Sequence, residues 1–181
     1  MSRPPYLPGD PAPDAEIARM LRVDHAGEYG ATRIYEGQLA ILGKRPAARA
    51  LREMAAAEER HLAEFETMLT GRRVRPTLLQ PVWSLAGWAL GAGTALLGER
   101  AAMAATVAVE EVIDEHYRAQ AERLGEEEPE LRDKILAFRD DELAHRDMAL
   151  AAGAEEMPGY DLLSAAIKAG SRLAIWLSTR L

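Results

Sequence analysis

Apolar side chains recur every three or four positions along most of this sequence, which is the spacing of one face of an α-helix. No segment shows the alternation of apolar and polar positions that is typical of a strand. The pattern, interrupted by glycines and prolines, predicts an all-α protein with helices at about residues 14–42, 46–69, 78–97, 99–124, 129–152 and 161–181. Residues 1–13 are rich in proline and are predicted to form an extended arm before a single domain at residues 14–181.

Four of these helices carry a glutamate in the middle of the apolar stripe, where a core side chain is expected. They are Glu28, Glu58, Glu110 and Glu142. One such glutamate is more often a salt-bridge partner or an error of helical phase. Burying four carboxylates without compensation costs on the order of several kcal/mol each. Four glutamates at matching depth therefore predict positive charge among them.

Two of the helices repeat a Glu-x-x-His motif, which places two ligands one turn apart on one helix face. Each motif is preceded, by 30 residues in one case and 32 in the other, by the glutamate of the helix before it. With a rise of about 1.5 Å per residue, the glutamates of each antiparallel hairpin come to nearly the same height. This is the di-iron or di-manganese carboxylate arrangement of ferritin-like bundles. The six candidate metal ligands are Glu28, Glu58, His61, Glu110, Glu142 and His145.

Other acidic residues stand close to these candidates along the chain. Helical phase excludes Glu59 and Asp141 as ligands, and it excludes Glu111 less firmly. Either Asp114 or Asp141 could accept a hydrogen bond from the free ring N–H of a ligating histidine. The alternative is that both aspartates are solvated.

Composition and charge narrow the class of protein. Among 181 residues, hydrophobic types make up 48%, aromatic types make up 6%, and the net charge is −7. The acidic balance argues against nucleic acid as a partner. The absence of cysteine excludes disulfides, iron–sulfur clusters and thiolate zinc sites, and it fits a cytoplasmic compartment. The first residues lack the apolar core of a secretory signal, so none is predicted.

The third predicted helix lies in a stretch of 21 residues without charge, from Leu78 to Gly98. That length could span a bilayer, but a span would separate two hairpins that must share one metal site. We expect a crossover helix at the membrane interface, with Trp83 and Trp88 near the headgroups. A buried crossover, or an oligomer contact through Gly87 and Gly91, is the alternative. The fold class predicted is therefore a ferritin-like four-helix bundle with this additional helix and an amphipathic C-terminal helix at about 161–181.

The last predicted helix mixes apolar residues with three basic ones. Lys168, Arg172 and Arg180 give an otherwise acidic protein a basic, apolar end. Such a helix suits an anionic lipid surface, although plain packing on the bundle is the alternative.

Three stretches of the sequence resemble the demethoxyubiquinone hydroxylase family. They are residues 21–31 (LRVDHAGEYGA), residues 105–111 (ATVAVEE) and residues 138–145 (FRDDELAH). The resemblance covers about residues 18–152, and all six metal-ligand positions of the family match the candidates above. It implies two irons per chain and hydroxylation of a polyprenylated demethoxyquinone by O₂ in ubiquinone biosynthesis. It further implies reduction linked to NADH and attachment to a membrane surface, on the cytoplasmic face of the inner or plasma membrane in a bacterium.

Several expectations stay open at this point. His116 and Tyr117 lie about two turns from Glu110 and are candidate catalytic residues that contact the quinone or relay protons and electrons, or else they are packing residues. His25, which lies one turn from Glu28, is likewise either a candidate of this kind or a packing residue. A homo-oligomer or a biosynthetic complex is left open. The alternative functions are another ferritin-like oxidase or peroxidase, and iron binding or storage.

Overall fold

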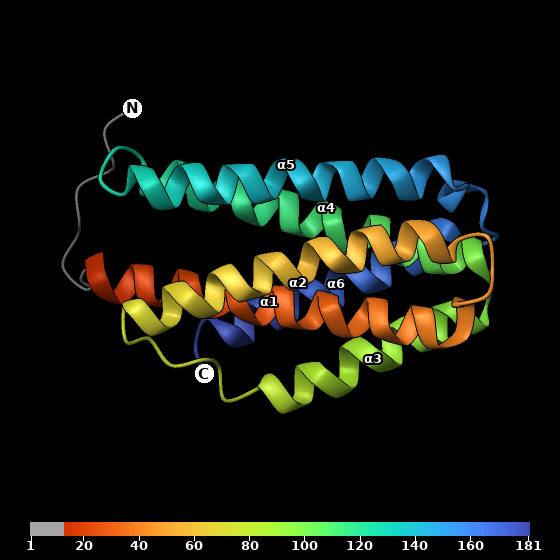
Figure 1. The fold of residues 1–181 in the computed structure, drawn as a ribbon, viewed down its shortest axis with the longest axis horizontal. Coiled ribbons are helices and arrows are strands. Elements are labelled where there is room, and N and C mark those ends of the chain that lie inside the picture. Colours follow the sequence, from red (N-terminus) through yellow and green to blue (C-terminus); the bar gives the residue numbers. More distant parts are fainter. Residues whose placement is uncertain (1–12) are drawn as a thin grey trace.

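The computed structural model describes residues 13–181, and in this range it contains six α-helices, one short 3-10 helix and no strand (Figure 1). The α-helices are α1 (Pro13–Leu42), α2 (Ala48–Gly71), α3 (Gln80–Leu96), α4 (Glu99–Leu124), α5 (Pro129–Ala151) and α6 (Tyr160–Ser178). The predicted all-α, ferritin-like class is confirmed. Helix α1 begins at Pro13, one residue before the predicted start at about residue 14. The rest of the predicted arm, residues 1–12, lies outside the described residues.

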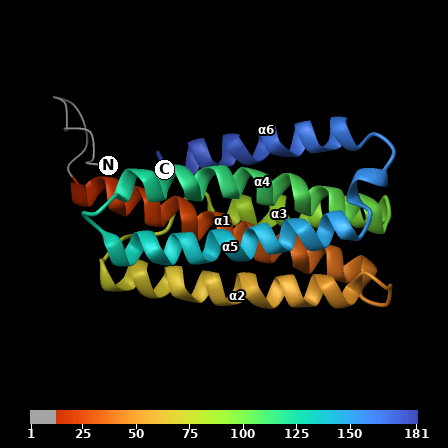
Figure 2. The ribbon, with the colours of Figure 1, turned by 90° about the horizontal axis from the view of Figure 1, so that it is seen from above.

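Four long helices form the bundle as two antiparallel hairpins. Helix α1 pairs with α2, and α4 pairs with α5 (Figures 1 and 2). Helix α3 packs along α1 and α6 packs along α4, so both additional helices cover the α1 and α4 side of the bundle. The chain reverses direction between α3 and α4 at Gly98, which has a φ of 116°. A residue with a side chain rarely adopts this backbone conformation.

Glycines let α3 approach the backbone of α1 very closely. A Cβ added at Gly91 would lie 2.0 Å from the carbonyl oxygen of Ile34, and one at Gly87 would lie 2.7 Å from that of Gly30. Only glycine permits such an approach. This corrects the alternative in which Gly87 and Gly91 form an oligomer contact, because both face α1 of the same chain.

The outer faces of α3 and α6 carry exposed apolar side chains. These are Val82, Leu85 and Trp88 in α3, Leu96 and Leu97 at its end, and Leu162, Leu173 and Trp176 in α6. Among the described residues, none of the helices has both the length and the hydropathy that crossing a membrane requires.

Two of the three basic residues expected at a lipid surface are paired with α4 instead. Lys168 forms an ion pair with Glu111, and the guanidinium of Arg172 lies 3.0 Å from the carboxylate of Glu115. Arg180 lies over the ring of Trp176, 4.0 Å from its centroid. The alternative of packing on the bundle therefore accounts for Lys168 and Arg172.

The four buried glutamates lie between two of the three apolar clusters that form the core. One cluster contains residues that precede the glutamate in α1 and follow it in α2, such as Leu21 and Phe65. The other contains residues from the opposite ends of these helices, such as Leu42 and Leu51. The predicted stripes thus face the core, and the polar layer lies between two apolar layers.

Candidate metal centre

The six predicted ligands converge at mid-bundle, and each is between 1% and 4% exposed. Their ligand atoms form two groups, and the atoms of each group all lie within 4.8 Å of one another. The groups are Glu28, Glu58, His61 and Glu142, and Glu58, Glu110, Glu142 and His145. Glu58 and Glu142 belong to both groups. An arrangement of two sites with two shared carboxylates follows.

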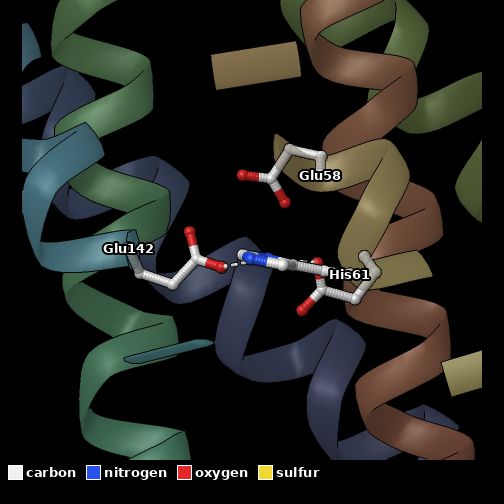
Figure 3. A group of neighbouring side chains, drawn as sticks. Glu58, His61 and Glu142 are labelled. Atoms are coloured by element: carbon white, nitrogen blue, oxygen red, sulfur yellow. Dashed lines mark hydrogen bonds and ion pairs between the residues drawn. The ribbon is translucent and has the colours of Figure 1, made fainter. Parts of the chain in front are cut away.

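The ring of His61 lies between the hairpins with both nitrogens engaged. Its Nδ1 lies 3.2 Å from Glu142 Oε1 and 3.5 Å from Glu28 Oε2. Figure 3 shows Glu142 of α5 directed toward His61, with Glu58 beside them. His61 Nε2 lies 3.0 Å from Asp141 Oδ2. Asp141 therefore fixes the orientation of the ring and leaves Nδ1 facing the carboxylates.

His145 occupies the equivalent place in the other group. Its Nδ1 lies 3.0 Å from Glu58 Oε1 and 3.2 Å from Glu142 Oε2. Both imidazoles therefore present Nδ1 to shared carboxylates.

The neighbouring acids lie outside this cluster. Glu59 is exposed, and Glu111 forms an ion pair with Lys168 of α6. Asp114 accepts a hydrogen bond from Arg139 at 2.6 Å, so of the two aspartates considered it is Asp141 that reaches a histidine. Glu59, Glu111 and Asp114 therefore lie away from the ligand groups, and Asp141 contacts one of them only through His61.

Burial dominates the electrostatics of the cluster. Burial raises the pKa of both Glu58 and Glu110 well above the ordinary value of a glutamate, and the negative charge of Glu142 is the second largest cause. Burial opposes ionisation of Glu142 too, but hydrogen bonds with His145 and His61 outweigh it and lower its pKa to about 2. A cluster of this kind holds protons that divalent cations can displace.

The donor set fits two divalent transition-metal ions. Glu28 Oε2 and Glu58 Oε1 are buried and accept no well-aligned hydrogen bond from the protein, although a histidine Nδ1 lies near each. Carboxylate and imidazole ligands suit iron or manganese, and four carboxylates neutralise two divalent charges.

Two tyrosines brace the cluster across the hairpins. The hydroxyl of Tyr35 in α1 donates to Glu110 Oε1 of α4 at 2.9 Å, and the hydroxyl of Tyr117 in α4 donates to Glu28 Oε1 of α1. Tyr117 was a candidate from the sequence, whereas the role of Tyr35 was missed. The signal was available, because each tyrosine follows a candidate glutamate by seven residues.

Polar contacts continue this repeat beyond the tyrosines. Gln120 Nε2 donates to Asp24 Oδ1 at 2.7 Å, and His116 Nε2 lies 3.0 Å from the same oxygen. In the other half, Gln38 Nε2 lies 3.4 Å from Thr106 Oγ1. Neither His116 nor any of these partners belongs to a ligand group.

His25 stays apart from the cluster. It is buried, and its Nδ1 has no hydrogen-bond partner in the protein. Burial lowers its pKa, which favours the neutral ring.

An apolar cavity of about 580 Å³ lies between α1, α3, α4 and α6. A smaller cavity of about 10 Å³ adjoins Glu110, Tyr35 and Thr106. The two cavities share three lining residues, Ala31, Ile34 and Val109. These three residues therefore lie between the large cavity and the Glu110 side of the cluster.

Comparison with known proteins agrees with the predicted family. The profile of the family described as ubiquinone biosynthesis protein COQ7 matches residues 15–178. The chain is 59% identical over 175 residues to a 3-demethoxyubiquinol 3-hydroxylase of Rhodospirillum rubrum, covering 96% of this chain and 82% of that protein. It is 50% identical over 171 residues to the human NADPH-dependent 3-demethoxyubiquinone 3-hydroxylase, mitochondrial, covering 92% and 79%. It is 39% identical over 188 residues to the 5-demethoxyubiquinone hydroxylase, mitochondrial, of Saccharomyces cerevisiae, covering 93% and 81%. By these matches, the chain belongs to the COQ7 family of ubiquinone biosynthesis proteins.

Proposed function

We propose that this chain is an O₂-dependent hydroxylase that acts on a polyprenylated demethoxyubiquinone or demethoxyubiquinol ring, with two irons held by the six buried ligands. The observation that carries the proposal is the pair of ligand groups sharing Glu58 and Glu142, in a chain whose relatives are named hydroxylases of this substrate. Glu28 and His61 complete one iron site, and Glu110 and His145 complete the other.

The protein's own residues orient the metal ligands and keep water out. When bound, the two irons supply the redox chemistry that activates O₂ for insertion of one oxygen atom. Tyr35 and Tyr117 hold Glu110 and Glu28 by hydrogen bonds from the opposite hairpin. Asp141 holds the ring of His61. The apolar layers on both sides of the cluster exclude bulk water, which protects the oxidising chemistry from side reactions.

The large cavity is suited to the substrate. Its volume of about 580 Å³ lies in the range of small-molecule sites, and its walls are almost entirely apolar. A polyprenyl tail binds well to such walls because burying it removes apolar surface from water. We infer an apolar route past Ile34 and Val109, along which the quinone ring reaches the Glu110 side of the cluster.

The same four helices suggest how the substrate arrives. The exposed apolar faces of α3 and α6 border the cavity, so we infer that these faces rest on a membrane surface from which the quinone enters. In a bacterium this is the cytoplasmic face of the inner or plasma membrane. For reduction we infer a nicotinamide nucleotide. The resemblance suggested NADH, whereas the name of the human relative specifies NADPH.

The decisive experiment uses iron-loaded protein. It is incubated with O₂, a demethoxyquinone and either NADH or NADPH, with a chemically reduced sample in parallel, and the hydroxylated quinone is quantified. Product in the reduced sample that depends on iron supports the proposal. A protein holding two irons that forms no product from the reduced state is evidence against it. Oxidation and retention of many irons per chain would instead favour storage.

A further inference from the structure

The internal repeat of the bundle differs in polarity between its two halves. Glu28 and Glu110 are each followed after seven residues by a bracing tyrosine. The residue before that tyrosine is Ile34 in α1 and His116 in α4. Ile34 lines both cavities, whereas His116 lines neither and contacts Asp24. One half of the repeat therefore faces the apolar route, and the other half holds a polar cluster.

The polar cluster connects accessible surface to the buried core. The side chain of His116 keeps 17% of its surface exposed, while the side chain of Asp24 is fully buried. Asp24 Oδ1 is shared by His116 and Gln120. Asp24 Oδ2 and Gln120 Oε1 are buried and accept no hydrogen bond from the protein, so each retains the capacity to accept one from water.

The cluster borders the metal centre at one of the bracing hydrogen bonds. Asp24 lies one helical turn before Glu28, and His116 immediately precedes Tyr117. The ring centroids of His116 and Tyr117 lie 6.0 Å apart, so the cluster adjoins the hydrogen bond that Tyr117 donates to Glu28. Burial raises the pKa of Asp24, which favours a carboxyl group that can hold a proton.

We infer that His116 and Asp24, held together by Gln120, conduct protons from water to the Glu28 side of the metal centre. This inference rests on the proposed function. In the hydroxylation the O–O bond breaks and one oxygen atom is inserted into a ring C–H bond. The other oxygen atom takes two electrons from the nicotinamide reductant and two protons, and leaves as water. The three residues that both cavities share, Ala31, Ile34 and Val109, are apolar and cannot carry protons, whereas the side chains of the Asp24 cluster can.

A histidine that transfers protons can be replaced by a small base from solution. In iron-loaded His116→Ala, we expect single-turnover hydroxylation to slow by about 100-fold, as expected for loss of a proton-transfer group. Added imidazole should restore much of the rate, because His116 is accessible from water. The rates restored by methyl-substituted imidazoles should follow the pKa of each base. If the added bases only filled the space left by His116, the restored rates would instead follow the size of each base.

A second variant and two controls complete the test. Asp24→Asn keeps a hydrogen-bonding side chain of the same shape but cannot take up a proton, so it should be slow and imidazole should not rescue it. In His25→Ala, which removes a buried histidine next to Asp24, imidazole should leave the rate unchanged, as it should in the wild type. The iron content and absorption spectrum of His116→Ala and Asp24→Asn should match those of the wild type.

The outcomes separate this inference from the proposed function. An iron-loaded wild type that makes no product contradicts the proposed function itself. An active wild type with either His116→Ala or Asp24→Asn within about twofold of its rate overturns the proton route. The same conclusion follows if imidazole fails to restore His116→Ala, or restores it in order of size. If His116→Ala does not fold, Asp24→Asn alone decides between these results.

Discussion

The two sides of the metal centre come from one sequence repeat but face different surroundings. On one side Tyr35 braces Glu110, and Ile34 opens toward an apolar cavity. On the other side Tyr117 braces Glu28, and the position equivalent to Ile34 is a histidine, His116. The repeat keeps the groups that orient the metal ligands and varies the residue beside them.

The two halves of the repeat also differ in the hydrogen-bond partners of their equivalent glutamines, Gln38 and Gln120. Gln120 donates to a carboxylate, Asp24, whereas Gln38 in the equivalent position donates to the backbone carbonyl of Ala102 at 3.1 Å and lies 3.4 Å from the hydroxyl of Thr106. Thr106 lines the small cavity next to Glu110. Under the proposed function, the two hairpins would supply an apolar route on one side and a polar route on the other, through changes at single positions.

The largest effect is expected where the two sides meet. Glu142 belongs to both ligand groups, and its side chain contacts both histidines. Under the proposed function, which gives the wild type about two irons per chain, Glu142→Ala should therefore lose nearly all of its iron and all hydroxylation. Circular dichroism should still show a helical protein, since the apolar layers remain. Metal analysis that finds two irons in this variant would contradict the shared role of Glu142.

A matched pair on α4 tests the helical phase. Glu110→Gln should lose iron from the His145 group, whereas Glu111→Gln should keep iron at the wild-type level, because Glu111 pairs with Lys168 outside the cluster. The reverse result would mean that α4 is rotated relative to the structure.

Much of this centre was predictable because its determinants are local. Helical periodicity placed the stripes, and the Glu-x-x-His spacing placed four ligands on two helix faces. The contact of Asp24 with α4 was not predictable in this way, because it depends on which helices become neighbours. The pairing of Lys168 with Glu111 has the same cause, and hydropathy alone suggested lipid for that lysine.

The next largest effect is expected where α3 packs against α1, beside the large apolar cavity. Gly91→Ala places a Cβ against the Ile34 carbonyl, so α3 must move away from α1. We expect a loss of about 3 kcal/mol in the free energy of unfolding, together with slower turnover of long-tailed quinones. Gly93 is exposed with nothing near it, so Gly93→Ala should be neutral or stabilise by about 0.5–1 kcal/mol. Denaturation curves that rank the two variants equally would show that the close approach is not needed.

The apolar route itself can be narrowed at a chosen depth. Val109 lines both cavities, and Ile113 lines only the large one. Val109→Phe should reduce hydroxylation of both short- and long-tailed quinones by on the order of 10-fold, because it obstructs the step into the small cavity. Ile113→Phe should affect long-tailed quinones more than short-tailed ones. Both variants should keep their iron. Equal kinetics for all quinones in both variants would place the route elsewhere.

The bracing tyrosines should behave alike, since they occupy equivalent positions. Tyr35→Phe and Tyr117→Phe each remove one hydrogen bond to a ligand carboxylate. Removing a hydrogen bond that orients a metal ligand lowers metal affinity by about 10-fold or somewhat more. Iron titration should give similar losses for the two variants. A loss confined to Tyr117→Phe would show that the polar side alone controls iron binding.

The smallest effect is expected just beyond the C-terminal end of α6. Lys168 and Arg172 are paired with α4, whereas Arg180 lies over the ring of Trp176. A basic residue near anionic lipid contributes about 1 kcal/mol to membrane binding. Arg180→Ala should therefore weaken binding to anionic vesicles by about fivefold in flotation, and added salt should reduce the difference. The double variant Lys168→Met with Glu111→Gln removes an ion pair without changing net charge, so its vesicle binding should match the wild type. If the double variant also detached from vesicles, α6 would need its anchoring on α4 to present the apolar face. If Arg180→Ala bound as tightly as the wild type at low salt, the apolar side chains of α3 and α6 would account for membrane binding without help from charge.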